Sequence, residues 1–192
     1  MKTIRFYPGD PDKGKTIIFD RSFEDRYNDP GNFLMKRDEN GFSRLVTTNG
    51  GNTLFMVGEG ASPEGNRPFL DRFDLESGES ERLWRSEAPY YEQPYELIDT
   101  ENLKLITRRE AVREQPNYFL RDLKNESLTQ LTEFPHPYPQ LKDIHKELLK
   151  YSRKDGVQLT GTLYLPYKEE EKNKNLPVVM WAYPREYKSA KA

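Results

Sequence analysis

Two stretches of the chain repeat one order of β-prone runs and turns. They are LFMVGEGASPEGNRPFLDRFDLESGESERLW, from Leu54, and LKLITRREAVREQPNYFLRDLKNESLTQLT, from Leu103. Each predicts a strand, a polar loop ending near a proline, a strand that closes on Asp-Leu, a turn and another strand. The Asp-Leu pairs begin at Asp74 and Asp122, which lie 48 residues apart (122 minus 74). That period suits a four-stranded propeller blade, although a meander of hairpins can mimic it.

Short β-prone runs also fill the remaining sequence before the proline cluster near residue 135, whereas the helical period is weak. Clusters of Gly, Asn, Asp and Pro separate these runs, as turns between strands require. The sequence therefore predicts a mainly β fold that contains part of a β-propeller with four-stranded blades. The expected strands are Lys15–Asp20, Asn32–Asp38, Ser43–Thr48, Thr53–Gly60, Phe69–Leu75, Ser80–Ser86, Tyr95–Thr100, Leu103–Glu110, Asn117–Leu123 and Leu128–Phe134.

A proline-rich segment, EFPHPYPQL (Glu133–Leu141), interrupts this pattern. Proline cannot donate to a sheet ladder and stiffens the chain, so we predict a domain boundary here, between residues 1–141 and 142–192. Beyond it, two strand candidates meet at Asp155-Gly156, a strong hairpin signal. A charged connector, YKEEEKNKN, then leads to LPVVMWAY (Leu176–Tyr183), which is typical of a strand covered on both faces.

Composition excludes several classes of protein. The 30 basic and 32 acidic residues leave a net charge of -2, so neither a nucleic-acid partner nor an acidic membrane is expected. The chain has no cysteine, which excludes disulfides and thiolate zinc sites, and two separate histidines cannot supply a metal site. No apolar run reaches about 18 residues, and the N-terminus has no signal-peptide pattern. We therefore expect no metal, cofactor or membrane span, and localisation stays undetermined.

The region after the proline-rich segment resembles the start of the catalytic domain of the prolyl oligopeptidase family of serine peptidases. The hairpin YSRKDGVQLTGTLYLP and the later LPVVMWAYP carry this resemblance. The motifs FDRSFEDRYNDPG, GEGASPEGNRPFLDRFDLESGE, PNYFLRDL, FPHPYPQL and MWAYPREYKS are similar to the glutamyl endopeptidase branch of that family. The resemblance implies that residues 1–141 are the last part of a β-propeller. Residues 142–192 would then hold the first strands of an α/β-hydrolase domain, and the chain would be a fragment of a longer peptidase acting on peptides.

The resemblance also implies that the catalytic Ser, acid and His lie beyond Ala192. No G-x-S-x-G occurs in the chain, and acyl transfer on this fold needs such a nucleophile elbow. GASPEG comes nearest, but a proline follows Ser62, and we expect an ordinary loop there. His136 and His145 are not expected to be catalytic. We therefore predict no triad in this chain and no peptidase activity from the chain alone.

Two kinds of site residue are expected from the resemblance. A tyrosine after the third strand of this fold donates its hydroxyl to the oxyanion hole, and Tyr183 is the match. Pro184 and Arg185 stand where the wider family has a glycine-rich loop. Specificity for glutamate would need a cation, for which Arg108, Arg109 and Arg113 are candidates. Because side chains alternate along a strand, at most one of Arg108 and Arg109 can point inward.

Two hypotheses follow for the function. The chain is either a non-catalytic part of a serine endopeptidase, whose propeller restricts access of substrates, or a free-standing β-rich binding module. A downstream G-x-S-x-G and a later His would favour the first. Open sheet edges and uncovered apolar faces also predict that the isolated chain is marginally stable or self-associates.

Overall fold

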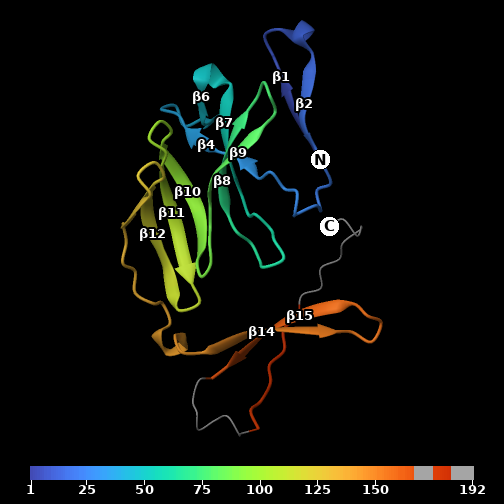
Figure 1. Ribbon diagram of the computed structural model, residues 1–192, viewed down its shortest axis with the longest axis vertical. Coiled ribbons are helices and arrows are strands. Elements are labelled where there is room, and N and C mark those ends of the chain that lie inside the picture. The colour runs from blue at the N-terminus through green and yellow to red at the C-terminus, as the bar shows by residue number, and fades with distance from the viewer. Residues whose placement is uncertain (167–174, 183–192) are drawn as a thin grey trace.

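A five-stranded antiparallel sheet forms the centre of the fold (Figure 1). The computed structural model describes residues 1–166 and 175–182. The long strands of this sheet, in order, are β7, β8 and β9, and the short strands β3 and β6 both pair with β7. Their bounds are β3 (Asn32–Phe33), β6 (Thr47–Thr48), β7 (Thr53–Gly58), β8 (Phe69–Asp74) and β9 (Ser80–Arg85).

The two predicted strands between residues 32 and 48 are each broken in two. Leu34 donates its N–H to the carbonyl of Phe55 on β7, while its own carbonyl accepts the N–H of Val46. The chain therefore changes partner at Leu34, and β4 (Met35–Arg37) pairs with β5 (Ser43–Leu45) in a separate hairpin. The expectation of continuous strands at Asn32–Asp38 and Ser43–Thr48 is wrong. Part of each segment pairs with β7, and the rest of each pairs with the other segment in the separate hairpin.

A second antiparallel sheet follows directly and has four strands in the order of the sequence. It is a simple meander, as expected for the second copy of the repeat. The strands are β10 (Tyr91–Asp99), β11 (Lys104–Ala111), β12 (Glu114–Asp122) and β13 (Ser127–Gln130). The prediction of a mainly β fold is therefore confirmed, with several small antiparallel sheets.

The two copies of the repeat share their turn chemistry. Asp74 accepts the N–H groups of Glu76 and Ser77, and Asp122 likewise accepts those of Lys124 and Asn125. The leucine after each aspartate donates its N–H to a backbone carbonyl just before the neighbouring strand. The acceptor is Asn52, before β7, in one copy and Leu103, before β11, in the other. The 48-residue spacing thus corresponds to one local structure formed twice.

These turns predict how stability depends on pH. Hydrogen bonds from Asn125 hold the pKa of Asp122 below its usual value of 3.8, so the ionised carboxylate stabilises the folded state. That contribution is present above pH 3.8 and is lost as the pH falls through the lower folded pKa. Asp122→Ala should therefore lower the melting temperature more at pH 7 than at about pH 2.5.

The matched control for this prediction is Asp143→Ala. Asp143 is exposed, and no side-chain hydrogen bond of its carboxylate is seen in residues 1–166 and 175–182. Its replacement should change the melting temperature little at either pH. Equal losses for Asp122→Ala at both pH values would contradict the role given to the carboxylate.

The core lies between the two sheets. Phe55 and Leu70 of the first sheet and Leu97 and Leu105 of the second form one buried cluster, which Trp84 covers in part. Successive residues of a strand point to opposite faces. The side chains of Leu54 and Met56 therefore point away from this cluster and belong to a second one on the other face of β7.

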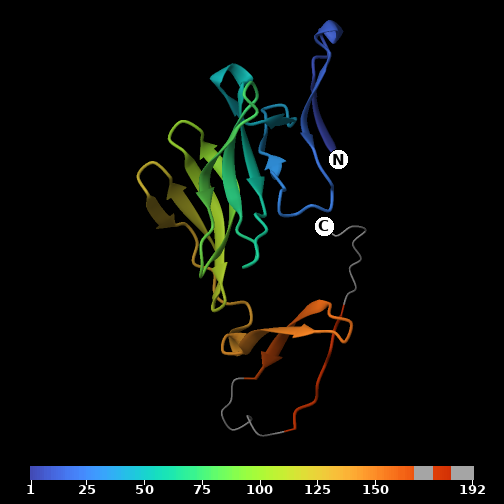
Figure 2. The same ribbon diagram turned by 45° about the vertical axis from the view of Figure 1, so that its right-hand side comes forward.

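The second cluster joins the first sheet to the N-terminal hairpin. Strands β1 (Lys2–Phe6) and β2 (Lys15–Asp20) form this hairpin, and Ile18 and Phe19 of β2 pack on the cluster. The rings of Phe19 and Phe73 lie 5.3 Å apart between centroids. Figures 1 and 2 show the resulting order of hairpin, first sheet and second sheet across the molecule.

A separate hairpin follows the proline-rich segment. Strands β14 (His145–Ser152) and β15 (Gln158–Leu165) pair along their whole length, and Gly156 takes a positive φ of 90° in the turn. The hairpin predicted at Asp155-Gly156 is thus confirmed. It lies beyond one end of the two large sheets in both views (Figures 1 and 2).

The buried strand predicted at Leu176–Tyr183 is not formed in the part that the structure describes. Residues 175–182 have no assigned strand, and the side chains from Val178 to Trp181 are 84% to 96% exposed. A strand of this composition needs neighbours on both faces, and no described strand pairs with it.

The charged connector predicted at 167–175 lies outside the described residues except for its last position. No helix among the described residues is long and apolar enough to cross a membrane.

Candidate functional site

One arginine of the second sheet is held between two aromatic rings. The guanidinium carbon of Arg109 on β11 lies 4.1 Å from the ring centroid of Tyr90 and 4.0 Å from that of Phe119. Tyr90 comes from the segment between β9 and β10, and Phe119 from β12. Stacking on aromatic faces favours the planar guanidinium and restricts its rotation. Arg109 is therefore a cation with a fixed orientation.

The donors of this guanidinium are almost unused. Its Nε is buried and has no hydrogen-bond partner in the described part of the chain. Its Nη2 lies 4.0 Å from a carboxylate oxygen of Glu114, which is beyond hydrogen-bond distance. A buried donor without a partner costs roughly 1–3 kcal/mol, so such a group is unusual in a folded protein.

A pocket of about 200 Å³ adjoins Arg109. Its polar lining consists mostly of amides and carboxylates, on β12, at the end of β13 and in the segment after β13. The other lining residues are Glu114, Gln115, Asn117, Phe119, Gln130 and Glu133. The pocket therefore combines one fixed cation with several groups that can form hydrogen bonds.

Asn117 holds the chain that borders this pocket. Its side-chain oxygen accepts hydrogen bonds from the Thr132 hydroxyl at 2.9 Å and from the Phe134 N–H at 2.7 Å. Gln115 donates to the carbonyl of Phe134. The backbone N–H of Leu131 still donates to the Tyr118 carbonyl, and beyond it these side chains fix the path of the chain as it leaves the sheet.

The other two candidate arginines lie elsewhere. Arg108 is 3.5 Å from Glu110 in an ion pair, and Arg113 is exposed in the turn between β11 and β12. Arg108 also lies near Tyr91, whereas Arg109 stacks on Phe119, so the two neighbours have different surroundings. The structure thus brings only Arg109 into the pocket just described.

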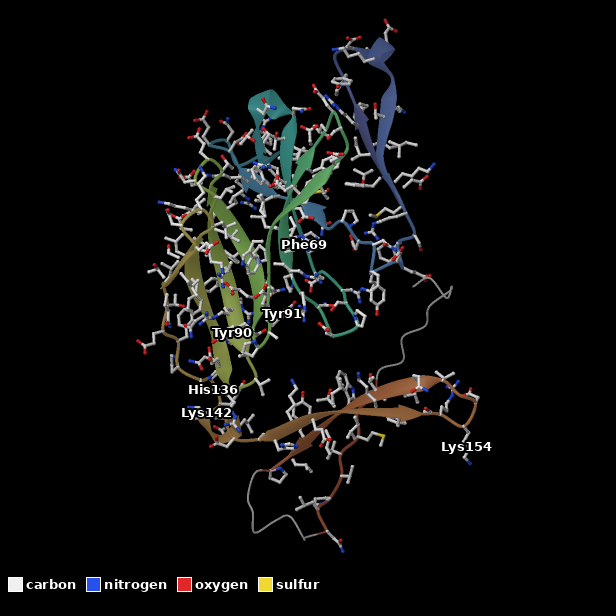
Figure 3. All side chains as sticks on the ribbon, viewed as in Figure 1. Phe69, Tyr90, Tyr91, His136, Lys142 and Lys154 are labelled. Carbon is white, nitrogen blue, oxygen red and sulfur yellow. The ribbon has the colours of Figure 1, made fainter. Side chains whose placement is uncertain are left out.

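Tyr91 ties the two sheets together beside this site. Its hydroxyl donates to Glu59 at 2.9 Å, and Gln93 donates to the same hydroxyl at 3.0 Å. Burial and the adjacent Glu59 carboxylate raise the pKa of Tyr91 to about 12, so the phenol remains a donor at neutral pH. Figure 3 shows Tyr90 and Tyr91 toward the end of the sheets that faces the hairpin of β14 and β15.

A buried carboxylate lies on the inner face of the second sheet. Glu92 is 2% exposed and receives two hydrogen bonds of 2.6 Å from the guanidinium of Arg121. The hydroxyl of Thr107 also donates to it. The Arg121 guanidinium lies 5.2 Å from the Trp84 ring of the first sheet. Together these contacts link four strands, β9, β10, β11 and β12.

The remaining sequence candidates have local roles or lie outside the described residues. The Ser62 hydroxyl donates to the carbonyl of Gly65 in its own loop, at 2.6 Å. His136 accepts the N–H of Tyr138 in the connector, and His145 lies 3.6 Å from Glu147 on β14. Among the described residues, no three His, Cys, Asp or Glu side chains are placed to hold a metal ion. Tyr183 lies outside the described residues, so its oxyanion role stays a prediction.

Sequence reasoning missed most of the groups around Arg109 and Glu92. Tyr90 precedes Arg109 by 19 residues (109 minus 90) and reaches it from a loop, for which no periodic signal exists. Glu92 stands in YYEQPYE, where a carboxylate looks solvated, and only its partner on β12 explains its burial. The alternation of side chains along a strand was the one sequence pattern that indicated different surroundings for Arg108 and Arg109.

Two curated proteins that are described as endopeptidases resemble this mainly β chain along nearly its whole length. The chain is 42% identical over 96% of its length to a probable chloroplastic glutamyl endopeptidase of Arabidopsis thaliana. It is 41% identical over 96% of its length to the protein of the same description in Oryza sativa subsp. japonica. The resemblance to glutamyl endopeptidases is therefore confirmed. The chain spans 21% of the length of each of these relatives.

No protein-family model matches the chain. Among solved structures, the AtxE2 isopeptidase is 15% identical, with a TM-score of 0.39 over 71% of this chain and 22% of that one. TolB from Acinetobacter baumannii is 14% identical, with a TM-score of 0.29 over 67% of this chain and 34% of that one. Both likenesses are distant in sequence and in structure.

Proposed function

We propose that this chain is a non-catalytic region of a serine endopeptidase that cleaves peptides through an acyl-enzyme, after glutamate. The observation that carries the proposal is the similarity over 96% of the chain to two probable glutamyl endopeptidases, of which it spans 21%. The two large sheets are the last blades of a β-propeller, and the hairpin of β14 and β15 begins an α/β-hydrolase domain. The blades restrict which substrates reach the catalytic centre.

The order of the elements supports this proposal. Each large sheet is an antiparallel meander, and the sheets pack face to face, which is how neighbouring blades bury their apolar faces. A proline-rich connector and a hairpin follow, at one end of the blades (Figure 1). A catalytic domain placed there would face the end of the sheets near Tyr90 and Tyr91 (Figure 3).

The first test compares this chain with the longer protein encoded by its gene. The 192-residue chain alone should hydrolyse no glutamate-containing peptide and react with no fluorophosphonate, because acyl transfer needs a nucleophile, base and oxyanion hole together. The longer protein should do both, and it should cleave short peptides in preference to folded proteins. Hydrolysis by the chain alone, or a longer protein that lacks a G-x-S-x-G and a later His, would favour the free-standing binding module instead.

The second test concerns Tyr183. In the longer protein, Tyr183→Phe removes one hydroxyl that would donate to the oxyanion of the tetrahedral intermediate. The rate constant for turnover should fall, with KM changed much less, because the hydrogen bond forms in the transition state. Trp181→Phe, one pleat earlier, serves as the matched control. Unchanged turnover in Tyr183→Phe would exclude the hydroxyl from the reaction.

A further inference from the structure

Two Asn-Gly pairs lie in exposed turns of the first half of the chain, and their hydrogen bonds differ. One is Asn40-Gly41, in the turn between β4 and β5, and the other is Asn49-Gly50, in the turn between β6 and β7. Asparagine is a thermolabile residue, and its side chain is most open to attack by the next backbone nitrogen when glycine follows, because glycine has no Cβ to obstruct the approach. Each pair is therefore a candidate for spontaneous chemical change.

Hydrogen bonds protect the first pair. The Gly41 N–H donates to the carbonyl of Asp38 at 2.9 Å. The Asp38 carboxylate also accepts the backbone N–H groups of Asn40 at 3.0 Å and of Phe42 at 2.9 Å. Attack by the Gly41 nitrogen on the Asn40 side chain must break the first of these bonds and distort the turn that the other two hold. Exposure alone therefore does not make this pair reactive.

The second pair has no such protection. Asn49 and Gly50 are exposed, and within residues 1–166 and 175–182 no hydrogen bond is made by the Gly50 N–H or by the Asn49 carboxamide. Asn49 has a positive φ of 50°, which costs free energy for a residue with a side chain. No described atom lies within 4 Å of the position that a Cβ on Gly50 would take. The turn can therefore change conformation, and both reacting groups are available.

We propose that Asn49 is a site of spontaneous deamidation in the folded protein. The Gly50 nitrogen attacks the side-chain carbonyl carbon of Asn49 and loses its proton. The bond from that carbon to the side-chain nitrogen breaks, and ammonia leaves with the proton, so that a succinimide ring forms. Water then opens the ring at the former side-chain carbonyl to give aspartate, or at the backbone carbonyl to give isoaspartate. The reaction needs water but no oxidant, reductant or enzyme.

The change affects a contact between two turns of the first sheet. The carbonyl of Asn49 accepts the N–H of Asn52 at 3.2 Å. Asn52 in turn donates its side-chain amide to Asp74 at 2.9 Å, and its carbonyl accepts the N–H of Leu75. In isoaspartate the main chain passes through the former side chain, and the Asn49 carbonyl becomes part of a free carboxylate. The support of Asn52 is then lost, and the Asp-Leu turn after β8 is held less firmly to the start of β7.

The experiment follows both pairs in the same 192-residue chain at mildly alkaline pH. Peptide mass spectrometry measures the conversion of each asparagine, and an isoaspartyl methyltransferase with a labelled methyl donor detects isoaspartate. Asn49 should convert about tenfold faster than Asn40, because attack at Asn40 must first break the Gly41 hydrogen bond and disturb those to Asp38. In concentrated urea the turns are lost, so the two pairs should convert at similar rates.

Variants separate the effect of the turn from that of the sequence. Asp38→Ala should speed the conversion of Asn40, because the turn loses the acceptor of two N–H groups, whereas Asp38→Asn keeps an acceptor oxygen and should leave Asn40 protected. Asn49→Gln should show no conversion at this position, because the longer side chain would have to close a larger ring. After incubation, the unsubstituted chain should melt at a lower temperature than Asn49→Gln incubated in the same way.

Equal rates at the two pairs in the folded chain, or faster conversion of Asn40, would overturn the inference. An unchanged rate at Asn40 in Asp38→Ala would also overturn it, because hydrogen bonding would then not be what protects a pair. If the converted chain melts as the fresh chain does, the link from Asn49 to the Asp-Leu turn is wrong. None of these measurements involves peptide cleavage, so their outcome is independent of the proposed peptidase function.

Discussion

Replacement of Glu92 by alanine is expected to lower the free energy of unfolding by about 3 kcal/mol. Glu92 is 2% exposed and accepts both hydrogen bonds of the Arg121 guanidinium. Its loss leaves a cation between the two sheets without a counter-ion and leaves the Thr107 hydroxyl without its acceptor. We take the lower end of the usual range for a broken buried pair, because the Arg121 side chain is 25% exposed and water can reach part of it.

Urea unfolding monitored by tryptophan fluorescence measures this loss, since Trp84 lies beside Arg121. Glu87→Ala is the matched control, because Glu87 is exposed and its carboxylate accepts no hydrogen bond in the described part of the chain. The double change Glu92→Met with Arg121→Met should recover much of the stability, because apolar side chains of similar length remove both charges. Equal stability of Glu92→Ala and Glu87→Ala would show that the pair contributes nothing.

Replacement of Gly31 by alanine is expected to cost about 3 kcal/mol or more. Gly31 has a positive φ of 85°, which disfavours any side chain. A Cβ at this position would also lie 2.3 Å from the carbonyl oxygen of Val57 on β7, an atom of the sheet backbone that cannot rotate away. The start of β3 must then move, and its pairing with β7 weakens.

Gly50→Ala provides the matched control for Gly31→Ala. Gly50 also has a positive φ, of 64°, but no atom lies within 4 Å of the position its Cβ would take. It should therefore cost only about 1–2 kcal/mol, the penalty for the left-handed conformation. The difference between the two variants, measured by urea unfolding, isolates the steric contact with β7. Equal losses in the two variants would mean that the backbone near Gly31 relaxes without cost.

Local chemistry predicted part of this fold from the sequence. The turn at Asp155-Gly156 and the Asp-Leu turns depend on neighbouring residues, and the structure has them where the sequence indicates. The division of the early strands at Leu34 depends on contacts with β7, which no local pattern reports. The apolar run at 176–182 shows the opposite error, because its composition predicts a buried strand but its burial depends on neighbouring strands.

The candidate site, too, could be predicted from the sequence only in part. Alternation along β11 indicated that at most one of Arg108 and Arg109 points inward, but it could not choose between them. The choice depends on Tyr90 and Phe119, which lie in different segments of the sequence and meet only in the folded chain. The lining of the pocket depends further on Asn117, whose side chain draws the segment after β13 back toward β12.

Asn117 also has a mechanical consequence. After β13, Leu131 still donates its backbone N–H to the Tyr118 carbonyl. Beyond it the chain is tied to the second sheet by the Asn117 side chain, which accepts from Thr132 and Phe134. A joint of this kind can release in one place without unravelling the strands behind it. Loss of the Asn117 side chain should therefore loosen the segment that leads to the hairpin of β14 and β15 before it affects the two large sheets.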